Sequence, residues 1–292
     1  CEEKTGNFYD VTGNVEYYTK DGVTDNHGVE AINWGDIHAA KIDKGVAKAS
    51  WGKGGMIDIL KPRVQLLHDL YDQKARNHHN IKDPYFMYKM HIAGTESVEE
   101  EVKHTGKVIK DLIRPSVETI VVQSNHDMAL QQWLKNTDYK YDPVNALFYL
   151  EMQYETYKQI SLGNNNFSVL EYALKTKCKG IKDIRFLSGT ESYTIAGGIE
   201  CGSHGCAGNG GARGSTRSHQ IQGIRYNIGH QHGANIMDGV YVSGVSGLLN
   251  MGYNAEGGSN WSHTHIITMK NGKRMNITLR ASKCKSKMKW RV

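Results

Sequence analysis

The sequence predicts a protein of the α/β class, and three observations support this. Strand-like and helix-like segments alternate between residues 29 and 123. Polar clusters follow the apolar segments at their C-terminal ends, which is where open α/β sheets place their functional groups. From residue 183 onward the apolar residues recur at every second position, as in half-buried strands. The chain is therefore expected to begin as a parallel α/β unit and to continue as a β-rich region.

The first half is expected to contain three short strands separated by helices. The apolar runs that predict these strands are residues 29–34, 64–67 and 117–123. Residues 39–61 look helical, and Pro62 would end that helix. Residues 73–96 are rich in histidine and are predicted to be irregular. Apolar residues at three- and four-residue spacing in 98–113 predict an amphipathic helix that leads into the third strand.

Three further helices and a series of strands are expected in the remainder. The predicted helices are residues 128–134, 142–160 and 168–177. Asp142-Pro143 and the Ser168 to Glu171 pair supply N-terminal capping signals for the last two. Strands are predicted at 183–188, 192–200, 223–228, 239–245, 261–269 and 274–280. Asn271-Gly272 predicts a type I′ hairpin between the last two.

The composition is that of an ordinary globular protein and argues against an integral membrane protein. Hydrophobic residues make up 39% of the chain and charged residues 23%, and no run approaches the roughly 20 apolar residues of a spanning helix. The five cysteines lack the spacing of a disulfide framework, which predicts free thiols in a reducing compartment. A chain of 292 residues can form one large domain or two small ones.

The net charge of +6 is concentrated at the C-terminal end. Six basic residues and no acidic residue lie between Arg280 and Val292, and the remaining 30 basic residues equal the 30 acidic ones. Such a tail is either a solvated end or a segment that suits a polyanion such as nucleic acid. Residues 281–292 are therefore treated as a basic tail, and residues 1–28 as an N-terminal extension from the end of an upstream domain.

Carboxylates, imidazoles and one amide gather at the ends of the predicted strands. These residues are Asp36, His38, Asp69, Asn125, His126, His204, His230 and His232. Five of the 14 histidines fall in these clusters, four of them directly beside Gly, Asp or Asn and none on an apolar helical face. A pair of borderline divalent metals requires such a ligand set, whereas a single ion needs only three or four ligands. The alternative is that these residues are ordinary polar strand exits.

In their order along the chain these clusters resemble the motifs of the calcineurin-like metallophosphoesterase superfamily. That superfamily carries Asp-x-His, Gly-Asp, Gly-Asn-His-Asp/Glu, a lone His and Gly-His-x-His. The matching segments are Asp36-Ile-His38, His68-Asp69, Ser124-Asn-His-Asp127, His204 and Gly229-His-Gln-His232. His68 and Ser124 stand where the superfamily has glycine, so the geometry of both loops is open. Asp72 and, more distantly, Asp58 are the alternatives to Asp69 as a bridging ligand.

The resemblance implies a four-layer α-β-β-α sandwich over residues 29–280. Two mixed sheets would pack face to face, with the first half of the chain supplying one and the β-rich half the other. It also implies two divalent ions that activate a bridging hydroxide, most often Mn²⁺, with Mg²⁺, Fe or Zn as alternatives. One ion would be held by Asp36, His38 and His232, and the other by Asn125, His204 and His230. Asp69 would bridge the two ions.

The catalytic roles that the resemblance implies fall on two neighbouring residues. His126 would donate a proton or stabilise charge at the scissile phosphate. Asp127 would orient the ring of His126. The chemistry implied is hydrolysis of a phosphodiester.

A closer likeness concerns the substrate. Residues 35–39 and 244–261 resemble the catalytic C-terminal half of a tailed-phage (T-odd coliphage type) pre-early protein that degrades host DNA. This implies a DNase in the cytoplasm of an infected cell, whose partners are DNA and an absent N-terminal portion, with homo-oligomerisation open. Arg213, Arg217 and the basic tail would contact DNA phosphates. Two alternatives are a small-molecule phosphatase or cyclic-nucleotide phosphodiesterase, and a non-catalytic DNA-binding protein.

Overall fold

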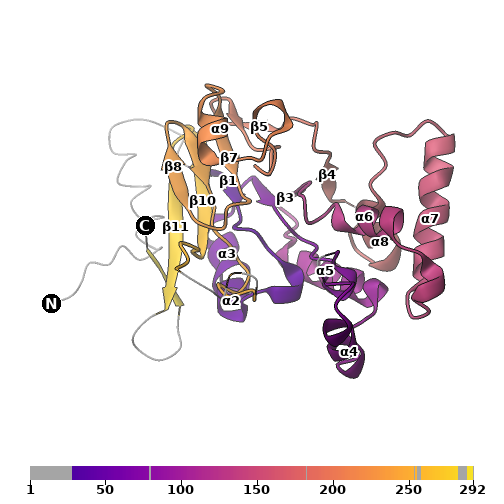
Figure 1. Cartoon of the computed structure of the whole chain (residues 1–292). Helices are drawn as coiled ribbons and strands as arrows, with labels where there is room; N and C mark the ends of the chain where they lie inside the picture. Colours follow the sequence, from indigo (N-terminus) through magenta and orange to yellow (C-terminus); the bar gives the residue numbers. More distant parts are fainter. Residues whose placement is uncertain are drawn as a thin grey trace, which may run out of the picture.

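Two mixed β-sheets form the centre of the fold, which a computed structural model describes for residues 28–78, 80–181, 183–252, 254, 258–281 and 288–291 (Figure 1). The first sheet has seven strands in the order β12-β11-β10-β1-β2-β3-β4, and the second has five in the order β5-β6-β7-β9-β8. Strands of the first sheet are β1 (Val29–Asn33), β2 (Val64–Leu67), β3 (Glu118–Val122), β4 (Arg185–Leu187), β10 (Thr264–Met269), β11 (Arg274–Ala281) and β12 (Met288–Arg291). Strands of the second are β5 (Thr194–Ile195), β6 (Ile199–Glu200), β7 (Arg225–Ile228), β8 (Asn235–Met237) and β9 (Val240–Val242).

Eight α-helices accompany the sheets within the described part of the chain. They are α2 (Lys44–Ser50), α3 (Met56–Leu60), α4 (Pro84–Ile92), α5 (Val98–Leu112), α6 (Ala129–Asn136), α7 (Ala146–Ser161), α8 (Val169–Lys177) and α9 (Thr216–Gln220). Four short 3-10 turns are η2 (Ala39–Lys41), η3 (Lys74–Arg76), η4 (Tyr139–Tyr141) and η5 (Asn209–Gly211). Helices α6, α7 and α8 lie at the end of the molecule farthest from β11 (Figure 1).

The α/β prediction is confirmed, with one correction to how the sheets are shared. Strands β1, β2, β3 and β4 pair in parallel, as the alternation of strands and helices predicts. However, β10 pairs antiparallel with β1, and β11 and β12 extend the same edge. The expectation that each half of the chain supplies its own sheet is therefore wrong. The last three strands of the chain complete the first sheet.

The two faces of the first sheet have different neighbours, because successive side chains of a strand point to opposite faces. On one face, Ala31, Leu66 and Ile120 pack against Ile195 and Ile199 of the second sheet. On the other face, strand residues join one large core with side chains from the helices; these strand residues are Ile32, Leu67, Val121, Ile267 and Ile277. The second sheet also contacts α9 through β8 and β9. The strands that lead into the site are thus packed between the helices on one face and the second sheet on the other.

Several predicted helices differ from the observed ones. The helix expected over 39–61 is broken into η2, α2 and α3. Between α2 and α3, Gly54 is left-handed (φ 72°) and Gly55 is the N-cap of α3. The region 73–96, predicted to be irregular, contains α4, whose N-terminus is capped by Asp83 before Pro84. Asp142 does not cap α7; its carboxylate pairs with Arg76 at 2.6 Å, and the helix begins at Ala146.

The strand predictions also need corrections at turns. Among Asn271 and Gly272 only the glycine is left-handed (φ 79°), and Met269 N–H donates to the Lys273 carbonyl, so the turn has three residues and is not type I′. The strand predicted at 192–200 is a hairpin of β5 and β6. Strands β8 and β12 and helix α9 were not predicted. No helix of the described residues is long and apolar enough to cross a membrane.

Candidate metal centre

The predicted site residues lie in loops that follow parallel strands. Asp36 and His38 follow β1, Asp69 follows β2, and Asn125 follows β3. The first two loops run side by side, since the N–H groups of Ile37 and His38 donate to the carbonyls of His68 and Asp69 at 2.9 and 2.8 Å. The C-terminal ends of parallel strands share one edge of a sheet, so these loops meet although they are far apart in sequence. The loop after β7 brings His230 and His232 to the same place.

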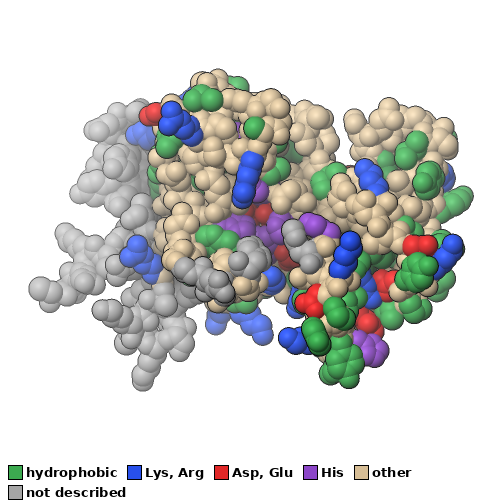
Figure 2. Space-filling model, viewed as in Figure 1, with side chains coloured by type: hydrophobic (Ala, Val, Ile, Leu, Met, Phe, Trp, Pro, Cys, Tyr) green, Lys and Arg blue, Asp and Glu red, His purple; other side chains and the backbone are tan. Residues whose placement is uncertain are grey.

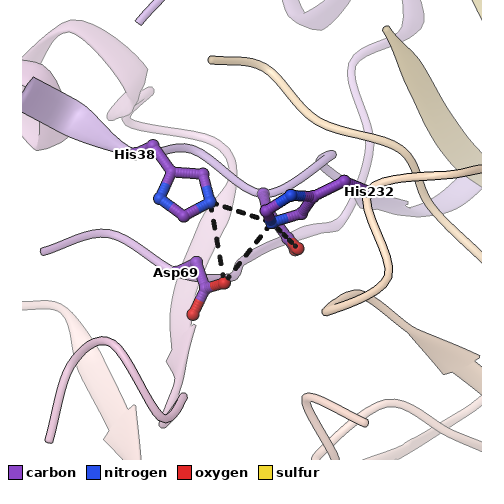
Figure 3. Close-up of side chains that lie close together, drawn as sticks. His38, Asp69 and His232 are labelled. Carbon is purple, nitrogen blue, oxygen red and sulfur yellow. Dashed lines mark hydrogen bonds and ion pairs between the residues drawn. The ribbon is translucent and has the colours of Figure 1, made fainter. Parts of the chain in front are cut away.

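Asp36, His38, Asp69 and His232 form a compact and buried group, which we call the Asp/His quartet. Their ligand atoms all lie within 4.8 Å of one another. His232 Nε2 is 3.2 Å from Asp36 Oδ2 and 3.0 Å from His38 Nε2. Figure 3 shows His38, Asp69 and His232 pointing toward a common centre, with His38 Nε2 3.7 Å from Asp69 Oδ2. The exposed fraction of each of the four residues is 5% or less.

Unsatisfied acceptors indicate that the quartet suits a cation. Asp36 Oδ1 and both carboxylate oxygens of Asp69 are buried without a hydrogen-bond donor, and His204 Nε2 is buried without a hydrogen-bond partner. Asp69 Oδ1 lies 3.3 Å from His204 Nε2, which is within ion-pair range but not aligned for a hydrogen bond. A buried carboxylate without donors is costly, whereas a divalent ion would satisfy it. The donor set of two carboxylates and two imidazoles fits a borderline divalent metal.

The backbone at the site is held in an unusual conformation. Among the described residues only seven non-glycine residues have a positive φ, and four of them are His38 (47°), Asp69 (47°), His230 (73°) and His232 (57°). Each such residue costs on the order of 1–3 kcal/mol. Such strain persists only where the surrounding structure imposes it, and it is found mostly at functional sites. The clustering on predicted ligands therefore supports a functional centre.

The second predicted ligand group is only partly assembled. His204 approaches Asp69, and the ring centroids of His204 and His230 are 5.3 Å apart. Asn125 is exposed and lines the same cleft as His230. His68, which stands at a position where the related motif has glycine, is buried with its Nδ1 3.5 Å from His204 Nδ1. The structure thus places His204 beside both Asp69 and His230, whereas Asn125 shares only the cleft with them.

Asp72 and Asp127 have contacts that the sequence did not predict. Asp72 Oδ1 accepts from His38 Nδ1 at 2.6 Å and lies 3.9 Å from His126 Nδ1, so Asp72 is the carboxylate beside His126. Asp127 instead accepts from the Tyr71 N–H and from Ser124, which fixes the turn after β3. The expectation that Asp127 orients His126 therefore does not hold in this structure.

The alternatives to Asp69 as a bridging ligand lie elsewhere. Asp72 contacts the nitrogen of His38 that faces away from the quartet, and His38, Asp72 and His126 form a separate ligand-like group. Asp58 of α3 pairs with Arg114 at 2.5 Å, outside the site. The geometry favours Asp69 as the shared residue, because it contacts both the quartet and His204.

The histidines and carboxylates of the site change one another's pKa. Burial alone lowers the pKa of His204, but Asp69 and Asp36 outweigh burial and raise that pKa to about 9. For His232, burial is likewise outweighed by the nearby carboxylates of Asp36 and Asp69, and its pKa rises to about 9. Burial raises the pKa of Asp69, but the histidines around it lower the pKa well below the usual value. Without a cation, protons on the histidines therefore balance the carboxylates.

A pH-dependent stability of the metal-free protein follows from these shifts. A histidine whose folded pKa is about 9 stabilises the fold fully below pH 6.5, and this contribution is lost as the pH rises through 9. We expect the unfolding free energy in EDTA to fall between pH 7 and 9.5, by up to about 1.4 kcal/mol per pH unit for each histidine. The melting temperature should fall with it. Saturating Mn²⁺ should remove this fall, since the metal replaces the protons. Thermal unfolding over this pH range, with and without Mn²⁺, measures the difference. An equal dependence of stability on pH in both series would contradict the assignment of His204 and His232 as metal ligands.

A cleft of about 1200 Å³ opens above the quartet. Figure 2 shows histidine and acidic side chains at the bottom of a hollow in the middle of this face, with lysine or arginine side chains near its edges. Of the two arginines expected to contact DNA phosphates, Arg213 lines the cleft, whereas Arg217 is exposed on α9 and does not line it. Lys41 and Lys74 also line the cleft and were not predicted. Their sequence neighbours give no periodic or motif signal that would have marked them.

Fold and site together define a mixed α/β protein with a buried Asp/His group that could hold a metal ion. The chain is similar to Protein A1 of Escherichia phage T5, with 41% identity over 287 residues. The similarity covers 96% of this chain and 50% of the phage protein, so the chain spans about half the length of that relative. No protein-family model and no solved structure matches the chain. This similarity confirms the predicted likeness to a phage protein.

Proposed function

We propose that the chain is a metal-dependent phosphodiesterase of the calcineurin-like metallophosphoesterase superfamily that hydrolyses DNA. The quartet carries this proposal, because its four residues come from three separate motifs of that superfamily and three of its four carboxylate oxygens are buried without donors. The layers agree with an α-β-β-α sandwich, since one face of the first sheet packs on helices and the other on the second sheet. The similarity to a phage protein supports a role in phage infection, in the cytoplasm of the host.

The ligand roles proposed for the site follow its geometry. Asp36, His38 and His232 would hold one ion, and Asn125, His204 and His230 a second, with Asp69 shared between them. We propose Mn²⁺ as the activating metal, with Mg²⁺, Fe or Zn as alternatives. When bound, two such ions would polarise the phosphoryl oxygens and lower the pKa of water. The Asp72 carboxylate fixes the ring of His38, which keeps Nε2 directed at the quartet.

The remaining residues would bind and protonate the substrate. His126 is partly exposed at the cleft and stands 3.9 Å from Asp72, so it can donate a proton to the leaving oxygen while Asp72 orients its ring. Burial lowers the pKa of His126, which makes its proton easier to transfer. Lys41, Lys74 and Arg213 line the cleft and would attract the phosphates of DNA.

Cleavage assays with controlled metal test the proposal. Supercoiled plasmid, linear duplex, single-stranded DNA and an aryl phosphodiester would each be incubated with the chain in Mn²⁺, Mg²⁺ or EDTA. We expect DNA cleavage that requires the metal and is abolished by EDTA, and the plasmid separates endonuclease from exonuclease action. Turnover of the aryl diester without DNA cleavage would instead favour a small-molecule phosphodiesterase. Bound metal without any turnover would favour a non-catalytic protein.

A further inference from the structure

Two aromatic side chains, Phe86 and Trp261, line the cleft together with Lys74 and Arg213. Aromatic rings interleaved with cations are typical of sites for unpaired nucleic acid, because bases stack on the rings while the cations follow the backbone. We propose that the cleft accepts DNA as an unpaired strand, and that Trp261 stacks on the base next to the scissile phosphate. This inference rests on the proposed nuclease function.

Trp261 is placed directly beside the quartet. Its ring centroid lies 4.2 Å from that of His232, and the two rings are nearly perpendicular (89°). The neighbouring Ser262 N–H donates to the His232 carbonyl at 3.1 Å, which ties the loop before β10 to the loop that carries His232. The Trp261 side chain is partly exposed and belongs to the cleft wall. A base on this ring would therefore lie next to a phosphate at the quartet.

Phe86 provides a second ring from a different element. It lies on α4, is partly exposed, and packs one side against the main core. Such packing holds the ring still, so little side-chain entropy is lost when a base stacks on it. Lys74 lines the same cleft and can neutralise a phosphate. The ring of Trp261 packs against His232 of the quartet, whereas that of Phe86 packs against the main core. We therefore infer that Phe86 stacks on a base farther from the scissile bond.

The depth of the quartet favours an unpaired strand over a duplex. Asp36 and His38 are 0% exposed and Asp69 is 1% exposed, so a phosphate must enter the cleft to reach them. A duplex is stiff over about 150 base pairs, and its phosphates are fixed on its outside. The cleft of about 1200 Å³ is only slightly larger than the roughly 300–1,000 Å³ of small-ligand pockets. A flexible single strand can enter such a space, and a paired strand must first separate from its complement.

Oligonucleotides with single tetrahydrofuran spacers in place of a nucleoside test both parts of this inference. In Mn²⁺, the wild type should cleave the unpaired strand at least about tenfold faster than a blunt duplex of the same sequence. A spacer beside the cleaved phosphate should lower kcat/KM about tenfold, as expected for a lost stacking contact. The Trp261→Ala variant should no longer be sensitive to the spacer beside the cleaved phosphate, whereas Trp261→Phe should remain sensitive to it. The Phe86→Ala variant should no longer be sensitive to a spacer elsewhere in the strand.

Controls separate this inference from the nuclease proposal and from misfolding. Tyr154→Ala removes an exposed ring of α7 outside the cleft and should keep the wild-type pattern. Metal content and melting temperature of each variant show whether the quartet is intact. Equal cleavage of duplex and single strand, or a Trp261→Ala variant as sensitive to the spacers as the wild type, would overturn the inference while the nuclease proposal stands. A wild type that hydrolyses only the aryl diester would overturn both.

Discussion

Replacement of Asp69 by asparagine is expected to lower metal-dependent cleavage at least about 10³-fold. Both oxygens of this buried carboxylate lack hydrogen-bond donors, and they face His38, His204 and His232 at 3.3–3.9 Å. An amide is neutral and has only one oxygen, so it cannot serve two cations. Initial cleavage rates at saturating Mn²⁺, together with metal content by atomic emission, measure the effect.

The matched control for Asp69→Asn is Asp58→Asn. Asp58 of α3 pairs with Arg114 away from the cleft. Loss of this ion pair should leave cleavage within about twofold, because a partly exposed ion pair contributes only up to about 1 kcal/mol. We expect Asp69→Asn to bind at most one metal ion per chain. A variant that kept more than a tenth of the wild-type rate would contradict the shared-ligand role of Asp69.

Gly229→Ala should produce the second large effect. A Cβ at this position would lie 2.2 Å from Asp36 Oδ1 and 3.3 Å from His204 Nδ1. Gly229 cannot easily move away, because its N–H donates to the His204 carbonyl at 2.9 Å. Its φ is not in the left-handed region, so the effect is steric and not a consequence of backbone strain. We expect Mn²⁺ affinity to fall by about 10–100-fold and the fold to lose about 1–3 kcal/mol.

Calorimetric titration of Mn²⁺ into Gly229→Ala, with Gly258→Ala as the control, measures this effect. Gly258 has open space where its Cβ would stand and no positive φ, so alanine there should leave the metal affinity at its wild-type value. If Gly229→Ala bound Mn²⁺ as tightly as the wild type, Asp36 would not be a ligand in the proposed position.

Much of the site could be predicted from the sequence, because the signals are local. A short apolar run followed by a polar cluster marks the end of a buried strand, and strand ends of a parallel sheet share one edge. Asp36, His38 and Asp69 could therefore be expected to meet, and the resemblance to the metallophosphoesterase motifs added His232. The structure places the ligand atoms of all four residues within 4.8 Å of one another. Residue chemistry also indicated a divalent metal, since carboxylates and imidazoles are its preferred ligands.

Other features depended on contacts between distant segments. Strands β10, β11 and β12 join the first sheet because β10 pairs with β1, and no local pattern specifies the partner of a strand. Asp72 lies beside His38 and His126, and Asp127 accepts a hydrogen bond from Tyr71, because of the way three loops pack together. Lys41, Lys74 and Trp261 reached the cleft in the same way.

The sequence by itself determined the α/β class, the parallel pairing of the first strands and the gathering of carboxylates and imidazoles at strand ends. Each of these follows from periodicity and residue chemistry within a short stretch. Only the tertiary structure decided the neighbours of each ligand, the left-handed backbone at His38, Asp69, His230 and His232, and the walls of the cleft. These depend on packing between segments far apart in the chain, and a difference of a few ångströms in that packing decides which carboxylate faces which histidine.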